Sequence, residues 1–150
     1  MTTLHDSTPE QDRSAAAADL TWLPVRPGED PWTQEEFEEV QQMLTDEIAR
    51  VGAELEMSEA DIETLMRNDG SGSGDDSADA GGKVLEREHE LTLAENSRRL
   101  LEQSRRALER LAARSYGRCE QCAEPIGKLR LQAFPRATLC VACKQKSERR

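Results

Sequence analysis

The chain of 150 residues is rich in charge and poor in aromatic side chains, with 33% charged and 3% aromatic residues. This composition argues against a thick globular core and fits long solvated helices better. No apolar run approaches the roughly 20 residues that a membrane-spanning helix needs. The N-terminus lacks a basic start followed by an apolar stretch, so we expect no secretion signal and a cytoplasmic protein.

The net charge of −10 is distributed unevenly along the chain. Residues 1–90 carry 24 acidic and 6 basic side chains, whereas residues 91–150 carry 6 acidic and 14 basic ones. The basic part could meet an acidic surface of a partner, or the two parts could attract each other as the faces of one hairpin. The charge pattern alone leaves both interpretations open.

Residues 1–31 are predicted to form a disordered tail. They are polar, include the alanine run Ala15–Ala18, and end in the proline-punctuated stretch Leu23-Pro24-Val25-Arg26-Pro27. Trp22 and Trp32 flank this stretch. They could fasten the tail to the helices, or Trp32 could simply pack locally in front of a helix.

The first helix is predicted to start at Thr33, because Thr33 and Glu36 form a capping box in which each side chain satisfies a free backbone N–H of the other. Apolar residues then recur at steps of three and four, which places them on one face of a helix. This stripe consists of Phe37, Val40, Leu44, Ile48, Val51 and Leu55. The helical pattern stops at Asn68.

Residues 68–82, with the sequence NDGSGSGDDSADAGG, contain no large apolar side chain and are predicted to form a flexible loop. The helical pattern resumes near Lys83 and continues to about Arg114. Its apolar positions are Leu85, Leu93, Leu100, Leu101, Leu108 and Leu111.

Two helices of this kind, joined by a loop, can bury their stripes only against each other. The sequence therefore predicts a mainly α fold, with an antiparallel coiled-coil hairpin over residues 32–114 and its tip loop at 68–82. At about 1.5 Å per residue, such a hairpin would extend on the order of 45–50 Å.

Residues 115–150 carry two cysteine pairs, Cys119-x2-Cys122 and Cys140-x2-Cys143, separated by 17 residues. Two residues between cysteines let both sulfurs face one ion, and two such pairs complete a closed tetrahedral shell that suits one structural zinc ion. Disulfides or free thiols in a core are the alternatives, and a cytosolic location disfavours disulfides.

This C-terminal domain is too small to fold on apolar burial alone, so zinc would supply folding free energy directly. We expect a four-cysteine zinc finger followed by a short C-terminal helix. The predicted small core consists of Tyr116, Ile126, Leu129, Leu131, Phe134 and Leu139.

The residues around the cysteines form a recognisable set: Tyr116-Gly117-Arg118-Cys119-Glu120-Gln121-Cys122, Pro125-Ile126, Arg130-Leu131-Gln132-Ala133, Pro135 and Leu139-Cys140-Val141-Ala142-Cys143-Lys144. This set resembles the zinc-finger signature of the DksA/TraR family. Upstream, Asp76-Ser77-Ala78-Asp79-Ala80 resembles the acidic motif at the tip of that family's coiled coil. The resemblance covers residues 33–146, and the preceding LPVRPGEDPWT is similar to actinobacterial members.

The resemblance implies a transcription regulator without enzymatic activity. Members of the family bind RNA polymerase rather than DNA, and insert the hairpin into the secondary channel of its largest subunit. It further implies that Asp76 and Asp79 lie near the active centre of the polymerase and modulate initiation. Some members act together with the alarmone ppGpp. We expect this chain to act as a monomer and not at a membrane.

Four residues of this chain depart from the family pattern, and one of them is Gly81, which stands where the tip motif usually carries alanine. Ala123 follows Cys122 where the family usually carries glycine, which tolerates a positive backbone φ at lower cost. Phe134 and Gln103 stand where alarmone-responsive relatives carry basic residues, although Lys144 and Leu100 match. Phenylalanine cannot pair with a phosphate, so we expect at most a weak response to ppGpp.

Two other function classes are alternatives to a polymerase regulator. A zinc-finger DNA-binding protein is favoured by the basic residues Lys144, Lys146, Arg149 and Arg150, but the strongly acidic first 90 residues would repel phosphates. A thiol redox switch would need reactive thiolates near Arg118 and Lys144, whereas closed structural zinc sites are usually inert. An enzyme has little support, because the sequence offers no open metal position, His–carboxylate cluster or nucleophile motif.

Overall fold

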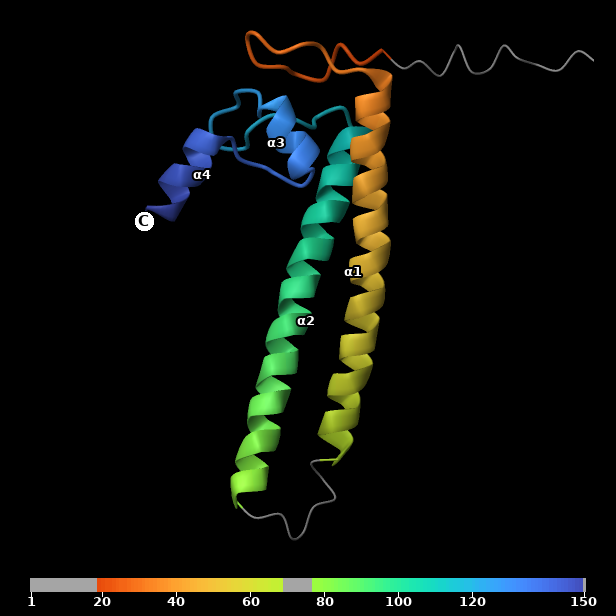
Figure 1. Ribbon diagram of the computed structural model, residues 1–150, viewed down its shortest axis with the longest axis vertical. Helices are drawn as coiled ribbons and strands as arrows, with labels where there is room; N and C mark the ends of the chain where they lie inside the picture. The colour runs from red at the N-terminus through yellow and green to blue at the C-terminus, as the bar shows by residue number, and fades with distance from the viewer. Residues whose placement is uncertain (1–18, 69–76, 150) are drawn as a thin grey trace, which may run out of the picture.

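The computed structural model describes residues 19–68 and 77–149, and for residues 77–79 the backbone alone. It contains four helices: α1 (Gln34–Asn68), α2 (Ser77–Ala112), α3 (Lys128–Ala133) and α4 (Val141–Glu148). Helices α1 and α2 run antiparallel as one long hairpin, and α3 and α4 belong to a small domain that projects sideways from its base (Figure 1). This arrangement confirms the predicted mainly α fold with a C-terminal four-cysteine domain. No described helix has the length and apolar character needed to cross a membrane.

Helix α1 begins with the capping box that the sequence predicts. The hydroxyl of Thr33 accepts a hydrogen bond from the Glu36 backbone N–H at 3.2 Å, and the Glu36 carboxylate accepts one from the Thr33 N–H at 2.9 Å. Two of the four free N–H groups at the helix start are thereby satisfied. The helix then runs unbroken for 35 residues. Its buried side chains are Val40, Leu44, Val51 and Ile62.

Helix α2 begins at Ser77, earlier than the start near Lys83 that the leucine pattern indicates. Ala78 and Ala80 are strong helix formers, and Asp79 falls in the first turn, where the helix dipole favours negative charge. These preferences outweigh the two glycines that follow at 81 and 82. Of the predicted tip loop 68–82, residues 69–76 lie outside the described residues. The hairpin helices have 35 and 36 residues, so each is about 53 Å long.

The face of α2 that packs on α1 carries mostly small side chains. It consists of Ala94, Leu101, Ser104, Ala107 and Leu111. Leu85 and Leu93, which the sequence places in the stripe, are 68% and 44% exposed. Leu93 and Leu100 are seven residues apart, and Ala94 and Leu101 repeat this spacing one position further along the helix. Of the two pairs, Ala94 and Leu101 face α1. Small side chains let the two helices approach closely. The buried face therefore contains fewer leucines than the sequence pattern suggests.

Residues 19–33, which we call the strap, are ordered against the base of the hairpin. The disordered tail expected over residues 1–31 therefore does not extend to residues 19–31, and residues 1–18 lie outside the described residues. Leu23 and Trp32 are buried, and the Trp22 ring meets Phe37 edge-to-face at a centroid distance of 6.3 Å. Prolines that limit the chain's freedom and two large aromatic side chains explain why this stretch packs instead of remaining solvated.

One apolar cluster joins the strap, both hairpin helices and the C-terminal domain. Its buried members are Leu23, Trp32, Val40, Leu44, Ala107, Leu111, Tyr116, Cys119, Ile126, Leu131 and Cys143. The prediction that Tyr116, Ile126 and Leu131 form the domain's core is confirmed, and Leu139 packs against the cluster's edge. The C-terminal domain is therefore not separate from the hairpin.

Leu129 and Phe134 do not belong to this core, contrary to the sequence-based expectation. They are 80% and 57% exposed. Helix α3 has six residues and turns Lys128 and Leu131 inward. Leu129 then points away, since adjacent residues on a helix lie about 100° apart.

Ser104 is buried between α1 and α2, and its hydroxyl oxygen has no hydrogen-bond partner. Replacing Ser104 by alanine removes an unsatisfied polar group, so the free energy of unfolding should rise by about 1 kcal/mol. Chemical denaturation of both proteins measures this difference. Ser97→Ala, at a half-exposed position of the same helix, reports the gain in helix propensity alone. A loss of stability in Ser104→Ala would contradict the assignment of the hydroxyl as unpaired.

Candidate metal centre and adjacent pocket

Four cysteines converge from two separate parts of the C-terminal domain. Cys119 and Cys122 lie in a turn after α2, whereas Cys140 and Cys143 lie at the start of α4. All four sulfur atoms lie within 4.8 Å of one another. Within the described parts of the chain, this is the one group of histidine, cysteine or acidic side chains arranged to hold a metal ion.

The spacing of the sulfurs fits a tetrahedral zinc site. With zinc–sulfur bonds of about 2.3 Å, two thiolates of such a site stand about 3.8 Å apart. The sulfurs of Cys122 and Cys140 are separated by 3.8 Å. A disulfide needs about 2.05 Å, and all four cysteines are free. Four thiolates leave no open coordination position, so the geometry is that of a structural site.

The first cysteine pair is held by a tight backbone turn. The N–H of Cys119 donates to the carbonyl of Glu124, and the N–H of Ala123 donates to the carbonyl of Cys119, both at 2.9 Å. The turn closes only because Ala123 adopts a φ of 63°. This is the left-handed region, which costs a residue with a Cβ roughly 1–2 kcal/mol. Glycine at this position would avoid that cost.

The second cysteine pair uses a helix terminus. Cys140 is the N-cap residue of α4, and its sulfur accepts a hydrogen bond from the Cys143 N–H at 3.5 Å. The local fold thus prepares this sulfur for a cation.

The pKa values of Cys119 and Cys143 are shifted in opposite directions. Burial raises the pKa of Cys119, but backbone hydrogen bonds at Cys140, Cys122 and Gln121 outweigh it and lower that pKa to about 6. A hydrogen bond with the Cys140 side chain, together with burial, raises the pKa of Cys143 to about 12. Without a metal, repulsion between like charges makes it unfavourable for all four sulfurs to be negatively charged at this separation. A divalent cation compensates their charge.

The domain is attached to α2 by a left-handed turn and a set of polar contacts. Arg114, with a φ of 58°, ends the helix, and the N–H of Ser115 bonds the carbonyl of Arg110 at 2.9 Å. The Arg110 guanidinium donates to the carbonyl of Arg118 at 2.9 Å and lies 3.6 Å from the Glu120 carboxylate. This pattern of backbone bonds is a Schellman motif, and it directs the chain into the metal site.

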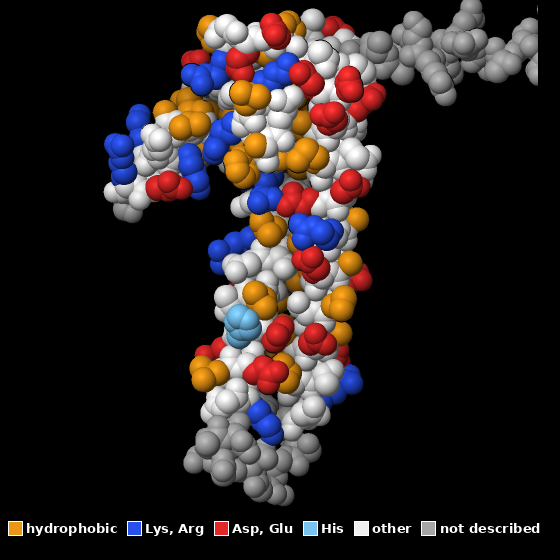
Figure 2. Space-filling model, viewed as in Figure 1, with side chains coloured by type: hydrophobic (Ala, Val, Ile, Leu, Met, Phe, Trp, Pro, Cys, Tyr) orange, Lys and Arg blue, Asp and Glu red, His pale blue; other side chains and the backbone are white. Residues whose placement is uncertain are grey.

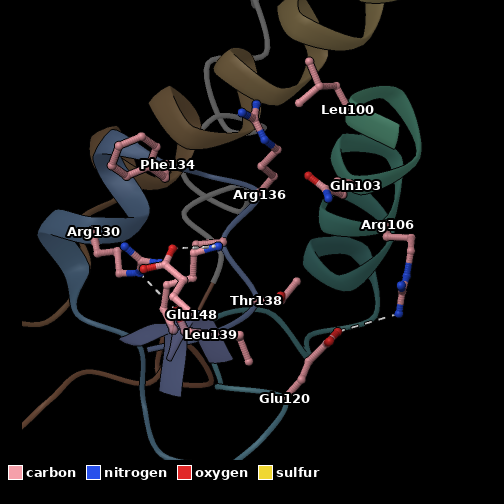
Figure 3. A pocket seen from close by; sticks show the side chains of 12 residues that line it. Leu100, Gln103, Arg106, Glu120, Arg130, Phe134, Arg136, Thr138, Leu139 and Glu148 are labelled. Atoms are coloured by element: carbon pink, nitrogen blue, oxygen red, sulfur yellow. Dashed lines mark hydrogen bonds and ion pairs between the residues drawn. The ribbon is translucent and has the colours of Figure 1, made fainter. Parts of the chain in front are cut away.

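A pocket of about 610 Å³ lies beside the metal centre, between α2 and the C-terminal domain (Figure 3). The sequence resemblance singles out Leu100, Gln103, Phe134 and Lys144, and all four line this pocket. The sequence had not indicated the other lining residues, which come from both elements. They are Arg106, Glu120, Arg130, Arg136, Ala137, Thr138, Leu139 and Glu148.

The cations of the pocket all have partners. Arg106 lies 3.7 Å from Glu120, Lys144 lies 3.5 Å from Glu148, and Arg136 pairs with Glu47 of α1. The remaining cation, Arg130, donates to the carbonyl of Leu139 at 3.0 Å. Lys and Arg side chains also gather around α4 on the face that Figure 2 shows. The pocket is therefore polar and moderately basic, with its charges already engaged.

Of the two predicted tip residues, Asp79 alone falls within the described residues. Asp79 belongs to the first turn of α2, and its side chain is not described. Asp76 lies outside the described residues. In Figure 1 the start of α2 is at the opposite end of the long axis from the C-terminal domain. The roles of Asp76 and Asp79 remain predictions.

Ala123→Gly should stabilise the protein by about 1 kcal/mol, because glycine adopts a positive φ without steric cost. Thermal or chemical unfolding of the zinc-loaded protein measures the change. Ala60→Gly, on the exposed face of α1, is the matched control and should destabilise by about 1 kcal/mol. Equal effects of the two substitutions would show that the turn at Ala123 is not strained.

Removal of the metal should unfold the C-terminal domain while much of the hairpin stays helical. Structural zinc sites contribute folding free energy directly, and the few apolar side chains of this domain cannot replace it. Chelator titration followed by nuclear magnetic resonance should show loss of dispersed signals from residues 115–149. Cys143→Ser should have the same effect without chelator. Signals that persist in the metal-free protein would contradict a structural role for zinc.

Comparisons with known proteins agree with this geometry. Residues 114–149 match the prokaryotic DksA/TraR C4-type zinc finger family. The RNA polymerase-binding transcription factor DksA of Caulobacter vibrioides is 40% identical over 75 residues, which are 50% of this chain and 53% of that protein. Its Escherichia coli counterpart is 33% identical over 73 residues, covering 49% and 48%. The chain thus spans about half the length of the curated relatives it matches.

The similarity in structure is more extensive. The solved structure of transcription factor DksA2 from Pseudomonas aeruginosa superposes with a TM-score of 0.62 at 30% sequence identity. The match covers 77% of this chain and 85% of that one. It therefore includes the hairpin as well as the four-cysteine domain.

Proposed function

The chain belongs to the DksA/TraR zinc-finger family, and we propose that it is an RNA polymerase-binding transcription regulator. The observation that carries this proposal is a long hairpin whose base shares one apolar core with a four-cysteine zinc finger. Relatives named as RNA polymerase-binding factors match the chain over about half of their length. A protein of this shape presents two contact points, the finger and the far end of the hairpin.

In the proposed mechanism, the finger and the hairpin base dock on the polymerase surface and the hairpin enters the secondary channel of the largest subunit. Helices of 35 and 36 residues reach about 53 Å, and a two-helix rod is narrow enough to enter a channel. The tip would then lie near the active centre and change the initiation properties of promoter complexes.

We assign the regulatory chemistry to Asp76 and Asp79 at the tip. Their carboxylates can accept hydrogen bonds from basic or polar groups of the polymerase, or perturb the coordination of magnesium. Functional side chains are often carried on segments that a rigid scaffold positions. The chain itself would act as a monomeric regulator in the cytoplasm and would catalyse no reaction.

The zinc ion would act as a structural element in this mechanism. Cys119, Cys122, Cys140 and Cys143 would ligate it and hold the finger's surface in shape. The closed shell offers no site for substrate, which fits a binding protein better than an enzyme.

We propose that ppGpp has at most a weak effect through the pocket beside the finger. Phe134 and Gln103 stand in that pocket where alarmone-responsive relatives carry cations, and neither can neutralise a phosphate. Three of the cations that do line it, Arg106, Arg136 and Lys144, are each paired with a carboxylate of the protein. A bound polyanion would compete with those carboxylates for the same cations.

The double variant Asp76→Ala/Asp79→Ala tests the tip mechanism. It should bind RNA polymerase as the natural chain does but lose its effect on transcription initiation in a reconstituted assay. Asp61→Ala, an exposed acidic position on the hairpin shaft, is the matched control and should retain regulation. Comparing reactions with and without ppGpp tests the expected weak response.

Two results would contradict the proposal at different points. Normal regulation by the double variant would exclude the tip aspartates as the active groups. No binding of the intact, zinc-loaded chain to RNA polymerase would exclude the function itself.

A further inference from the structure

Lys128 is the one charged residue that is buried among the residues that the structure describes. It stands at the start of α3, in the zinc-finger domain. Its side chain is 10% exposed and points into the junction between the finger, the strap and the start of α1. A buried ammonium is costly unless its hydrogen bonds and charge are satisfied, so its surroundings need an explanation.

Each element at this junction contributes a partner. The Lys128 ammonium lies 2.5 Å from the Glu36 carboxylate of α1, and 3.2 Å and 3.4 Å from the carbonyls of Pro31 and Asp30 in the strap. It also stands 5.6 Å from the centre of the Trp32 ring, a cation–π distance. The three N–H groups of a lysine thus have three oxygen acceptors.

The backbone of Lys128 adds a second attachment. Its N–H donates to the Glu29 carboxylate at 2.8 Å, and the other oxygen of that carboxylate accepts from the Arg26 N–H at 2.9 Å. Nearby, Pro24 of the strap packs so closely on Gly117 that a Cβ there would lie 3.2 Å from it. The strap therefore follows the contour of the finger closely.

Apolar contacts alone would not define how the finger sits on the hairpin. Burial of apolar surface is non-directional and scales with area, so related orientations of the finger could bury similar areas. A buried ammonium with three acceptors from two other elements is satisfied in one orientation only. In some proteins, buried ionic groups contribute specificity of arrangement more than stability.

We infer that Lys128 is a positioning residue that fixes the direction in which the zinc finger leaves the hairpin. Its acceptors lie on the elements that the finger packs against, which are α1 for Glu36 and the strap for Asp30 and Pro31. The consequence for a partner rests on the function proposed above: a finger in one direction holds both contact points in register with one surface. A finger with several directions would dock less often in the productive geometry.

The distance between finger and hairpin in the zinc-loaded, full-length protein tests this inference. Nitroxide labels attached through p-acetylphenylalanine at the exposed positions Gln41 and Lys146 leave the cysteines untouched. Electron–electron double resonance should give one narrow distance for the natural sequence. In Lys128→Met the distribution should broaden or gain a second maximum, while zinc stoichiometry and the thermal midpoint are retained.

Two further variants make the outcome decisive. Glu36→Gln keeps a side chain able to complete the capping box but removes the carboxylate charge facing Lys128, so it should broaden the distribution as well. Lys144→Met removes an exposed lysine of the same finger and should leave it narrow. A narrow, unshifted distance in both Lys128→Met and Glu36→Gln would overturn the inference, whatever their stability.

Polymerase binding is measured separately with the same variants. If distances broaden and affinity for polymerase falls, the positioning role extends to docking. If the chain does not bind polymerase at all, the proposed function fails while the distance measurement still decides the role of Lys128.

Discussion

Burial of a few apolar side chains at the base of the hairpin is the interaction on which the rest of the structure depends. Leu44 of α1, Leu111 of α2, and Ile126 and Leu131 of the finger meet in one cluster that the strap closes with Trp32. The helices are otherwise highly charged, and helices of this kind gain most of their stability from packing rather than propensity. The direction of the rod and the place of the metal site both follow from this junction.

Polar contacts then specify what the cluster leaves undetermined. Arg110 fastens the first metal-binding turn to α2, Arg136 connects the finger to α1, and Lys128 joins three elements at once. Exposed ion pairs along the helices contribute little each. The paired groups at the junction are less solvated and directional, so their effect is on arrangement. Metal binding and hairpin geometry are linked because Cys119 and Cys143 belong to the same cluster as Leu44.

The sequence predicted the features that are local or chemically specific. A capping box at Thr33, the periodic stripe of α1 and the cysteine spacing each follow from contacts within a few residues or from one metal's preferences. The conformation of Ala123 was also foreseeable, because the family resemblance implies glycine at that position. The four pocket positions named by the resemblance, among them Phe134 and Lys144, come together in space.

The sequence did not predict features that depend on which surfaces meet. In α2, Leu93 and Leu100 are spaced seven residues apart, and so are Ala94 and Leu101. Only packing on α1 decides that Ala94 and Leu101 are buried and Leu93 is not. The strap looked like a solvated tail because its apolar residues have no period. Lys128 gave no signal at all, since a buried lysine is recognised only once Glu36 and the strap carbonyls are in place.

The buried contacts of the hairpin become sparse away from its base. Beyond Val51 the buried side chains of the described helices are Ile62 and Ala94, and large apolar residues such as Met57, Met66 and Leu85 are exposed there. Local opening is least costly where few apolar contacts hold an element. Amide hydrogen exchange should therefore form a gradient along the rod, slow beside the zinc finger and fast at the far end. The molecule thus combines a tightly packed base with a far end whose backbone opens more readily.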